Sequence, residues 1–227
     1  MNKTIETDVL VIGSGLAGLS AAWAAAKRGC EVTLLTRTPN PEESNTFWAQ
    51  GGIIYRGRDE SPDQLVADIL SAGAGLSSPA AAALLSREGP RLVKQILIDE
   101  LQVPFDPSPE YPGELDLTKE AGHSIPRIIH FKDRTGFSIE RAFLERVKAN
   151  PKVKVIANAT SVDLLTPSHH SVEPTDVYRP VTCVGAYVLD QTTGKISAVL
   201  AKETILASGG LGSVFLHTTN PPGARGD

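Results

Sequence analysis

The sequence has little cysteine, few aromatic residues and no long apolar run. Its two cysteines, Cys30 and Cys183, lie far apart and have no Cys or His neighbours at metal-ligand spacing. We therefore expect neither a disulfide framework nor a metal site. No stretch approaches the roughly 18 consecutive apolar residues that a membrane-spanning helix needs, and the N-terminus lacks the pattern of a signal peptide. A cytoplasmic protein that makes no membrane contact is expected.

Charge of one sign is not in large excess either. Lys and Arg number 22 and Asp and Glu number 26, so the formal net charge is −4, which argues against a nucleic-acid binder. Hydrophobic residues make up 41% of the chain, charged residues 21% and aromatic residues 5%, which is typical of a globular α/β protein with a core of small apolar side chains. The 227 residues, about 1.5 times a typical domain, allow one large domain or one domain with part of another.

The N-terminal segment predicts a strand, a helix and a second strand. Residues 8–12 are apolar and β-branched, residues 16–28 are rich in alanine and end before Gly29, and residues 31–36 return to a strand pattern. The two strands of such a βαβ unit belong to one parallel sheet. The expected fold class is α/β, with a Rossmann-like domain.

The rest of the chain predicts helices first and strands afterwards. Helices are expected at residues 62–72, 79–101 and 137–150, with Ser61 and Ser78 as N-caps and an interruption at Gly89 and Pro90. Strands are expected at residues 153–156, 161–166, 181–189, 196–201 and 204–207, with a hairpin across residues 190–195. Residues 102–126 look irregular, and residues 167–180 indicate a surface excursion.

A glycine-rich loop joins the first strand to the helix. Its sequence, Gly13-Ser14-Gly15-Leu16-Ala17-Gly18, matches the dinucleotide-binding pattern G-x-G-x-x-G in the strand–loop–helix context that the pattern requires. Gly13 permits the tight turn, Gly15 lets the backbone approach a pyrophosphate, and Gly18 brings helix and strand close together. The helix N-terminus adds backbone N–H groups and partial positive charge. The alternative is a tight turn that binds no ligand.

The acidic residue that commonly binds the ribose of NAD is missing from the end of the second strand. Thr36 and Arg37 stand there instead. The Thr36 hydroxyl could bond the ribose, and Arg37 could face the adenine, the phosphates or the extra phosphate of NADP.

The loop that follows favours a flavin, because it gathers many hydrogen-bond donors that could serve an isoalloxazine ring. Two aromatic side chains in it could cover a flat ring. The loop residues are Ser44, Asn45, Thr46, Phe47, Trp48, Ala49, Gln50, Gly51 and Gly52. The alternative is that the aromatic residues anchor the core and the others form a solvated loop.

These segments resemble the N-terminal part of the L-aspartate oxidase family, within the succinate dehydrogenase and fumarate reductase flavoprotein superfamily. Three more segments carry the resemblance, namely Glu120-Ala121-Gly122-His123-Ser124, Arg127-Ile128-Ile129-His130 and Thr218-Thr219-Asn220-Pro221 with Gly226-Asp227. The resemblance implies non-covalent FAD and the oxidation of L-aspartate to iminosuccinate, with oxygen or fumarate as acceptor. That reaction is the first step of de novo NAD biosynthesis. An association with quinolinate synthase is not readable from the sequence.

The resemblance also implies a domain organisation. Residues 1–227 would form the N-terminal part of an FAD-binding domain, with a parallel sheet, an antiparallel β element, and the flavin loop and helical excursions within residues 37–135. The sequence would be truncated before the family's capping domain and C-terminal helical domain, so the fragment alone is expected to be inactive.

Two positions distinguish this chain from the succinate and fumarate enzymes. Asn45 stands where those enzymes typically carry a histidine that bonds covalently to FAD. Glu120 would contact the substrate ammonium group, which succinate lacks. His123 could bond a substrate carboxylate or brace the loop, and both possibilities stay open. The cationic candidates for binding a dicarboxylate are Arg127, Arg134, His123 and His130, the last more in keeping with a structural role.

The remaining FAD contacts implied by the resemblance come from later segments. Thr160 and Ser161 follow a strand and would offer backbone groups to the adenine. Ala207 and Gly209 lie in a second glycine turn, and Asp227 would contact the ribityl or phosphate region. Two other functions stay open, namely a fumarate reductase or succinate dehydrogenase type of flavoprotein and a non-catalytic FAD-binding fragment.

Overall fold

The computed structural model describes residues 4–226, so Asp227 and the contact expected of it lie outside the described residues. The chain divides into two compact units. The first consists of Met1–Phe47 and Phe143–Asp227, and the second of Trp48–Ala142. Most of the excursion expected within residues 37–135 therefore falls in a compact unit of its own. Within residues 4–226, no helix is long and apolar enough to cross a membrane.

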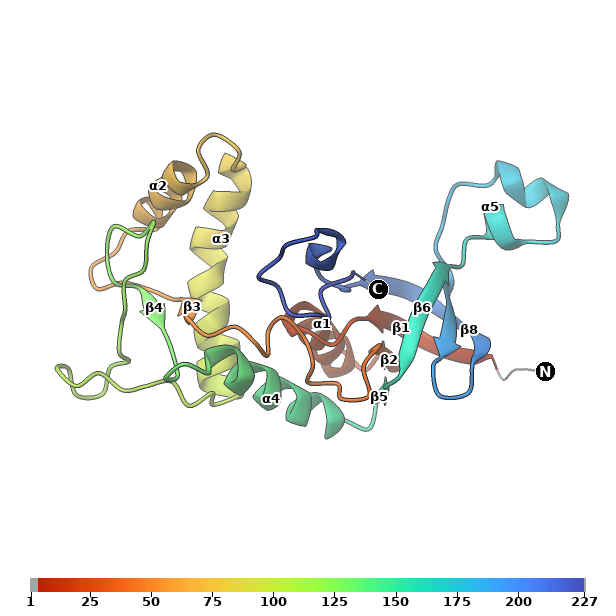
Figure 1. Cartoon of the computed structure of the whole chain (residues 1–227), viewed down its shortest axis with the longest axis horizontal. Helices are drawn as coiled ribbons and strands as arrows, with labels where there is room; N and C mark the ends of the chain where they lie inside the picture. The colour runs from red at the N-terminus through yellow and green to blue at the C-terminus, as the bar shows by residue number, and fades with distance from the viewer. Residues whose placement is uncertain (1–3, 227) are drawn as a thin grey trace. The chain divides into compact units, whose positions relative to one another are not determined.

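The first unit contains a six-stranded sheet with the strand order β5-β2-β1-β8-β7-β6 (Figure 1). The parallel strands are β1 (Ile5–Ile12), β2 (Val32–Leu35), β5 (Val153–Ile156) and β8 (Lys195–Leu206). The antiparallel strands are β7 (Gly185–Asp190) and β6 (Ala159–Leu164). This arrangement confirms the expected α/β fold with a parallel sheet and an antiparallel element.

Two helices bury apolar side chains in the first unit. Leu10 and Val11 of β1 are fully buried, as the continuous apolar pattern of that strand predicts. Helix α1 (Leu16–Lys27) buries Leu19, and its Trp23 packs edge-on against Phe143 with ring centroids 6.2 Å apart. Phe143 belongs to α4 (Thr135–Lys148), which begins in the sequence of the second unit and ends in that of the first.

Strand β8 is one continuous strand of 12 residues, whereas the sequence predicted two separate strands. Its first half forms the expected hairpin with β7, and its second half runs parallel to β1 up to Leu206. The polar residues Lys202 and Glu203 are exposed and do not interrupt the pairing. Lys202 Nζ lies 2.7 Å from Asp8 Oδ1 of β1, which gives this exposed stretch a partner.

The second unit contains α2 (Pro62–Ala72) and α3 (Pro79–Leu92), which lie side by side (Figure 1). Ser78 caps α3 as predicted, since its Oγ accepts from Ala81 N at 3.4 Å, but the described chain shows no side-chain cap bond for Ser61. The interruption predicted at Pro90 is wrong. The helix continues past Pro90 into the π-helical segment η1 (Val93–Glu100). Pro90 has no backbone N–H to donate, yet the segment after it stays helical, and the wider turns of η1 begin at Val93.

A small antiparallel sheet in the second unit was not predicted. It pairs β3 (Ile53–Ile54) with β4 (Ile128–Ile129), and Tyr55 N donates to Arg127 O at 2.8 Å just beyond it. Ile128 and Ile129 are buried. Strands of two residues carry no periodic pattern, so the sequence alone could not reveal this pairing.

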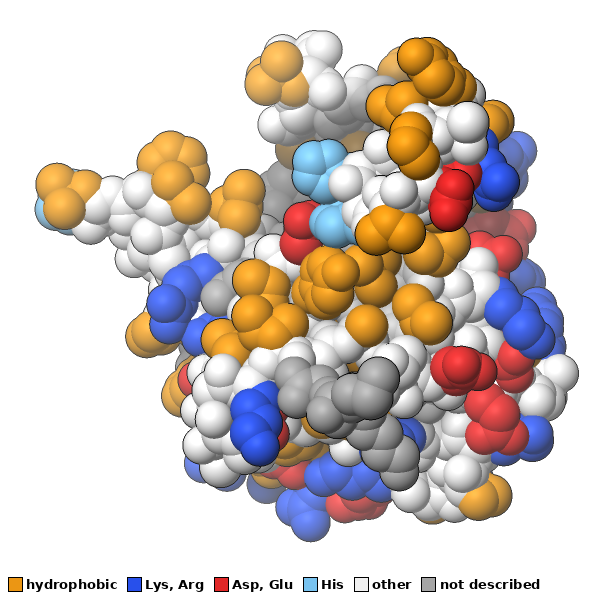
Figure 2. All heavy atoms as spheres, turned by 90° about the vertical axis from the view of Figure 1, so that its right-hand side faces the viewer, with side chains coloured by type: hydrophobic (Ala, Val, Ile, Leu, Met, Phe, Trp, Pro, Cys, Tyr) orange, Lys and Arg blue, Asp and Glu red, His pale blue; other side chains and the backbone are white. Residues whose placement is uncertain are grey.

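Three short helical turns complete the first unit: α5 (Pro167–His170), η2 (Pro174–Tyr178) and η3 (Gly212–Val214). The first two form the surface excursion that was expected at residues 167–180. Val172 and Tyr178 within it are 93% and 89% exposed. Figure 2 shows apolar side chains and histidines gathered on the face of the molecule that carries this excursion.

Candidate functional site

Two glycines of the phosphate loop are required by the fold itself. Gly13 has φ +112°, and a Cβ there would overlap the carbonyl oxygen of Ala207. A Cβ on Gly18 would overlap the carbonyl oxygen of Gly13. These approaches bring the loop against α1 and against the end of β8, as the roles expected of the two glycines require.

Gly15 differs from its two neighbours. As the N-cap of α1 it has φ −71° and ψ −179°, a conformation that any residue adopts. The nearest described atom to a Cβ at this position is Thr46 Oγ1, at an ordinary 3.6 Å. The chain's own packing therefore does not require glycine here. Close approach of a pyrophosphate to the backbone does, so the loop fits a dinucleotide.

The start of α1 lies against the first part of the flavin loop. Leu16 N donates to Thr46 Oγ1 at 3.1 Å, and Phe47 N donates to Ser44 Oγ at 3.2 Å. Ala17 is exposed, and the first turn of the helix contains no acidic residue. The partial positive charge of this helix end is therefore not neutralised locally, which suits a phosphate. Asn45 is exposed.

Hydrogen bonds between buried hydroxyl groups hold the phosphate loop in place. Ser14 Oγ lies 2.8 Å from Pro41 O and 3.0 Å from Thr36 Oγ1, and Thr36 Oγ1 lies 3.5 Å from Thr38 Oγ1. Ser14 and Thr36 are only 4% and 5% exposed. The contact expected between Thr36 and a ribose would have to compete with these bonds, and it stays a prediction.

Gln191 joins two of the segments that were expected to bind the adenosine half. Its Nε2 donates to Arg37 O at 2.7 Å and to Thr160 Oγ1 at 3.0 Å. Arg37 Nη2 donates to Gly223 O at 3.4 Å. Sequence reasoning missed Gln191, which follows a hairpin strand and carries no motif.

Thr160 and Ser161 follow strand β5, as expected. They lie within the next strand, β6, opposite Leu189 and Val188 of β7. Strand pairing therefore takes up part of the backbone of this segment. Their contact with the adenine stays a prediction.

The second glycine turn meets the phosphate loop at the end of β8. Ala207 N donates to Ile12 O at 2.8 Å, and its carbonyl group faces Gly13. Gly209 has φ +80°, and no described atom lies within 4 Å of where its Cβ would be. The backbone of this turn is therefore accessible beside the loop.

The second part of the flavin loop, in the second unit, is tied to the start of α4. Ala49 O accepts from Gly136 N at 2.8 Å, and Gln50 O accepts from Thr135 Oγ1 at 3.3 Å. Gly52 has φ +128°, and a Cβ there would lie only 2.7 Å from Ile129 O, so this position requires glycine. Trp48 is 58% exposed.

Glu120 and His123 belong to one tight turn. His123 N donates to Glu120 O at 3.3 Å, and Gly122 has φ +84°. A positive φ at the third of four residues is typical of a type II turn, which brings the end residues within about 7 Å of one another. The exposed Glu120 carboxylate approaches Gly51, since its Oε1 would lie 2.5 Å from a Cβ there. The structure therefore brings Glu120 to the flavin loop.

Arg127 is not available to bind a dicarboxylate. Its side chain is 0% exposed, with Nε 2.6 Å from Glu60 Oε1 and Nη1 2.6 Å from Asp68 Oδ2. His130 is also engaged, because its two ring nitrogens lie 3.2 Å from Asp106 Oδ2 and 3.1 Å from Asp116 Oδ2. The side chain of Arg134 is 71% exposed, and its Nε lies 4.0 Å from Asp133 Oδ1.

Asp68, a residue of α2, links that helix to the segment just after the turn of Glu120 and His123. Its Oδ2 accepts from Ser124 N at 2.8 Å and from Ser124 Oγ at 2.9 Å, in addition to the ion pair with Arg127. These interactions, the backbone bond from Ser124 above all, lower the pKa of Asp68 from 3.8 to about 2. The carboxylate is therefore ionised whenever the protein is near neutral pH.

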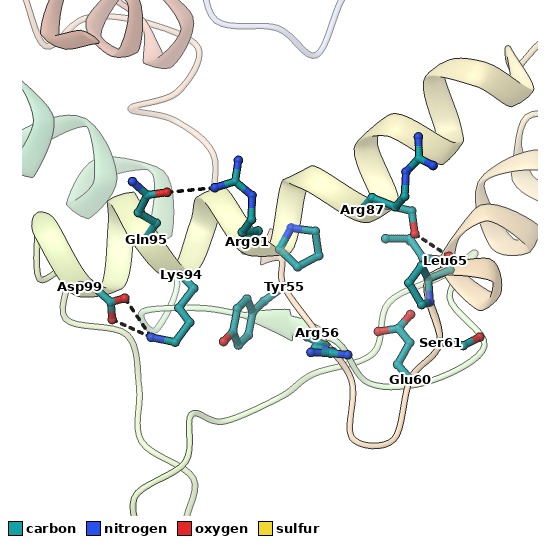
Figure 3. A pocket seen from close by; sticks show the side chains of 13 residues that line it. Tyr55, Arg56, Glu60, Ser61, Leu65, Arg87, Arg91, Lys94, Gln95 and Asp99 are labelled. Atoms are coloured by element: carbon teal, nitrogen blue, oxygen red, sulfur yellow. Dashed lines mark hydrogen bonds and ion pairs between the residues drawn. The ribbon is translucent and has the colours of Figure 1, made fainter. Parts of the chain in front are cut away.

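A cavity of about 400 Å³ lies along α3 and η1 (Figure 3). Arg91 bonds Gln95 and Lys94 bonds Asp99 at its rim. Glu60 lines the cavity and also holds Arg127 and Gly57 N. One residue of the buried ion pairs, Glu60, therefore lines the cavity. The turn at Glu120 and His123 does not line it.

Residues 8–227 match the family described as FAD binding domain. The chain is 37% identical to L-aspartate oxidase of Halobacterium salinarum, covering 100% of this chain and 42% of the relative. It is 36% identical to L-aspartate oxidase 1 of Ralstonia nicotianae, covering 97% and 40%. The fold of the E. coli quinol fumarate reductase is similar, with a TM-score of 0.83 at 21% identity, covering 98% of this chain and 36% of that one.

These matches confirm the resemblance inferred from the sequence, and FAD is the cofactor of the chain. The chain spans about two-fifths of the length of the curated relatives that it matches.

Proposed function

The chain belongs to the FAD binding domain family, and from this premise we propose that it is part of a flavoprotein that oxidises L-aspartate to iminosuccinate. One observation carries the proposal. The exposed carboxylate of Glu120 lies against Gly51 of the flavin loop, where it can meet the ammonium group of an amino acid.

Residues of the first unit would hold the cofactor. The backbone at Gly15 and the amide groups of the first turn of α1 would bind the pyrophosphate, with Ser44 and Thr46 beside them. The side chain of Asn45 cannot make the covalent bond that a histidine makes, which supports non-covalent binding. FAD, when bound, supplies an acceptor for two electrons.

Glu120 would select an amino acid over a simple dicarboxylate. A carboxylate that faces an ammonium group makes a charge-assisted hydrogen bond. Succinate has no ammonium group, so it would leave Glu120 unpaired and add like charge to the site. This difference supports L-aspartate as the substrate rather than succinate.

The remaining parts of the proposal concern the whole protein. Oxygen or fumarate would take up the two electrons that L-aspartate loses, and the iminosuccinate formed would enter de novo NAD biosynthesis. The names of the curated relatives support this assignment. The location that we propose for the protein is the cytoplasm.

The substitution Glu120→Gln tests the proposal in the FAD-loaded protein expressed from its complete gene. Loss of one charge-assisted hydrogen bond should weaken L-aspartate binding by about 1.5–3 kcal/mol, or roughly 10- to 150-fold. Fumarate binding should not weaken, because fumarate has no ammonium group and the substitution removes a like charge. Titration of the flavin absorbance with each ligand measures both dissociation constants.

Glu110→Gln is a matched control, because Glu110 is an exposed carboxylate of the same unit that lies outside the turn. It should leave both affinities unchanged. Equal losses for the two ligands in Glu120→Gln would give Glu120 a structural role and remove the main support for an amino-acid substrate.

A further inference from the structure

We propose that buried Arg127 is a positioning residue, which fixes His123 as a neutral imidazole with its proton on Nε2, so that Nε2–H donates to a carboxylate of the substrate. The carboxylate ligand rests on the proposed function, whereas the protonation of the ring follows from the chain alone. This resolves the two possibilities that the sequence leaves open for His123.

The contact between Arg127 and His123 determines which ring nitrogen carries the proton. Arg127 Nη1 lies 2.7 Å from His123 Nδ1. A guanidinium group has only donors, so Nδ1 must accept through its lone pair. A neutral imidazole that accepts at Nδ1 carries its proton on Nε2. An imidazolium ring would instead direct a second N–H at the guanidinium group.

Arg127 itself is held from the opposite side. Its ion pairs with Glu60 and Asp68, each at 2.6 Å, fix the guanidinium group in one orientation inside the second unit. Asp68 also binds both Ser124 N and Ser124 Oγ, next to His123 in the chain. The same carboxylate therefore anchors the arginine and the turn whose histidine the arginine contacts.

His123 Nε2 remains available to a ligand. It has no hydrogen-bond partner among residues 4–226, and it is not one of the buried atoms that lack a partner. His123 and Glu120 close the same turn, so their Cα atoms lie within about 7 Å. One turn therefore presents an anionic acceptor and a neutral donor, which match the ammonium and carboxylate groups of one amino acid.

The protonation of the ring can be measured without any substrate. Nitrogen-15 NMR of the FAD-loaded, histidine-labelled protein from its complete gene should show His123 protonated at Nε2 and bare at Nδ1 near neutral pH. The signal is assigned by its loss in His123→Gln. Arg127→Lys, which keeps a donor and a charge, should retain this form of the ring. A ring protonated at Nδ1, or at both nitrogens, would overturn the proposal.

Glu60→Gln is the control for general damage to the cluster. It removes one ion pair of Arg127 but does not touch His123. It should lower the unfolding temperature and leave the proton on Nε2. If Glu60→Gln moves the proton away from Nε2, the ring responds to any loss of packing, and the specific role of Arg127 is refuted.

A second experiment tests whether His123 Nε2–H donates to a carboxylate of the ligand. It measures the binding of L-aspartate and of succinate through the flavin absorbance. His123→Leu should weaken both ligands by roughly 10- to 150-fold, because both carry carboxylates. His123→Gln offers an amide N–H near the place of Nε2–H and should restore most of the loss. Unchanged affinity of both ligands in His123→Leu would refute the proposed contact.

These outcomes are separable from those of the proposed function. If L-aspartate is not a substrate, the NMR result and the succinate titration still decide between a positioned donor and a histidine that only braces the loop.

Discussion

The three glycines of the phosphate loop should respond differently to the same added methyl group. Gly15→Ala places a Cβ in ordinary contact distance of Thr46 Oγ1, at 3.6 Å, with φ −71° already suited to alanine. Gly13→Ala and Gly18→Ala place it inside the carbonyl groups of Ala207 and Gly13. The first substitution should therefore lower the affinity for the cofactor, and the other two should lower the stability of the fold.

The expected magnitudes follow from these contacts. Gly15→Ala should change the free energy of unfolding of the apoprotein by no more than about 1 kcal/mol, and could raise it by restricting the unfolded chain. Gly13→Ala combines backbone strain with overlap, each of which destabilises by about 1–3 kcal/mol. FAD affinity in Gly15→Ala should fall by about 1.5–3 kcal/mol for each charge-assisted bond lost, or roughly 10- to 150-fold.

Urea unfolding of the apoprotein and titration with FAD measure the two effects separately. Gly89→Ala in α3 is a matched control, since its Cβ would also have room, with Leu85 Cδ1 at 3.7 Å, and it lies outside the loop. It should leave FAD affinity unchanged. A Gly15→Ala protein that binds FAD as tightly as the parent would refute the assignment of Gly15 to the pyrophosphate.

Two further substitutions test interactions that hold the site together. Thr46→Val removes the acceptor of Leu16 N at the start of α1. The free energy of unfolding, measured by urea unfolding, should fall by about 1 kcal/mol. An unchanged value would mean that water replaces the lost hydrogen bond. Asp68→Asn should destabilise the protein most above pH 3.8, the usual pKa, because the carboxylate then interacts in its ionised form with Ser124 and Arg127. The difference should shrink as the pH falls toward about 2, the lowered pKa of folded Asp68, and a pH-independent difference would contradict this cause.

The parts of the fold that the sequence predicts are the local ones. Strand β1, the glycine loop and α1 follow one another without interruption, and each has its own pattern and termination signal. Gly13 and Gly18 are needed because other chain segments pack against them, and Gly15 is needed because a ligand would lie against it. Each glycine of the motif could therefore be interpreted separately.

The buried ion pairs could not be predicted in this way. Arg127 was a candidate for binding a dicarboxylate because nothing beside it in the sequence reveals Glu60 and Asp68. These partners come from segments 67 and 59 residues away, as the difference in residue numbers shows. A charge is normally exposed, and only tertiary packing shows that it has partners. The type II turn is different, because Gly122 at its third position was a local signal that could have been used.

Anaerobic reduction of the flavin tests the central claim most directly. The FAD-loaded protein, expressed from its complete gene, is mixed with L-aspartate or with succinate in the absence of oxygen, and the flavin absorbance is followed. The proposal predicts bleaching by L-aspartate, loss of that bleaching at low L-aspartate concentration in Glu120→Gln, and no bleaching by succinate. Bleaching by succinate but not by L-aspartate would contradict the assignment of Glu120 to an ammonium group and identify a succinate or fumarate flavoprotein instead.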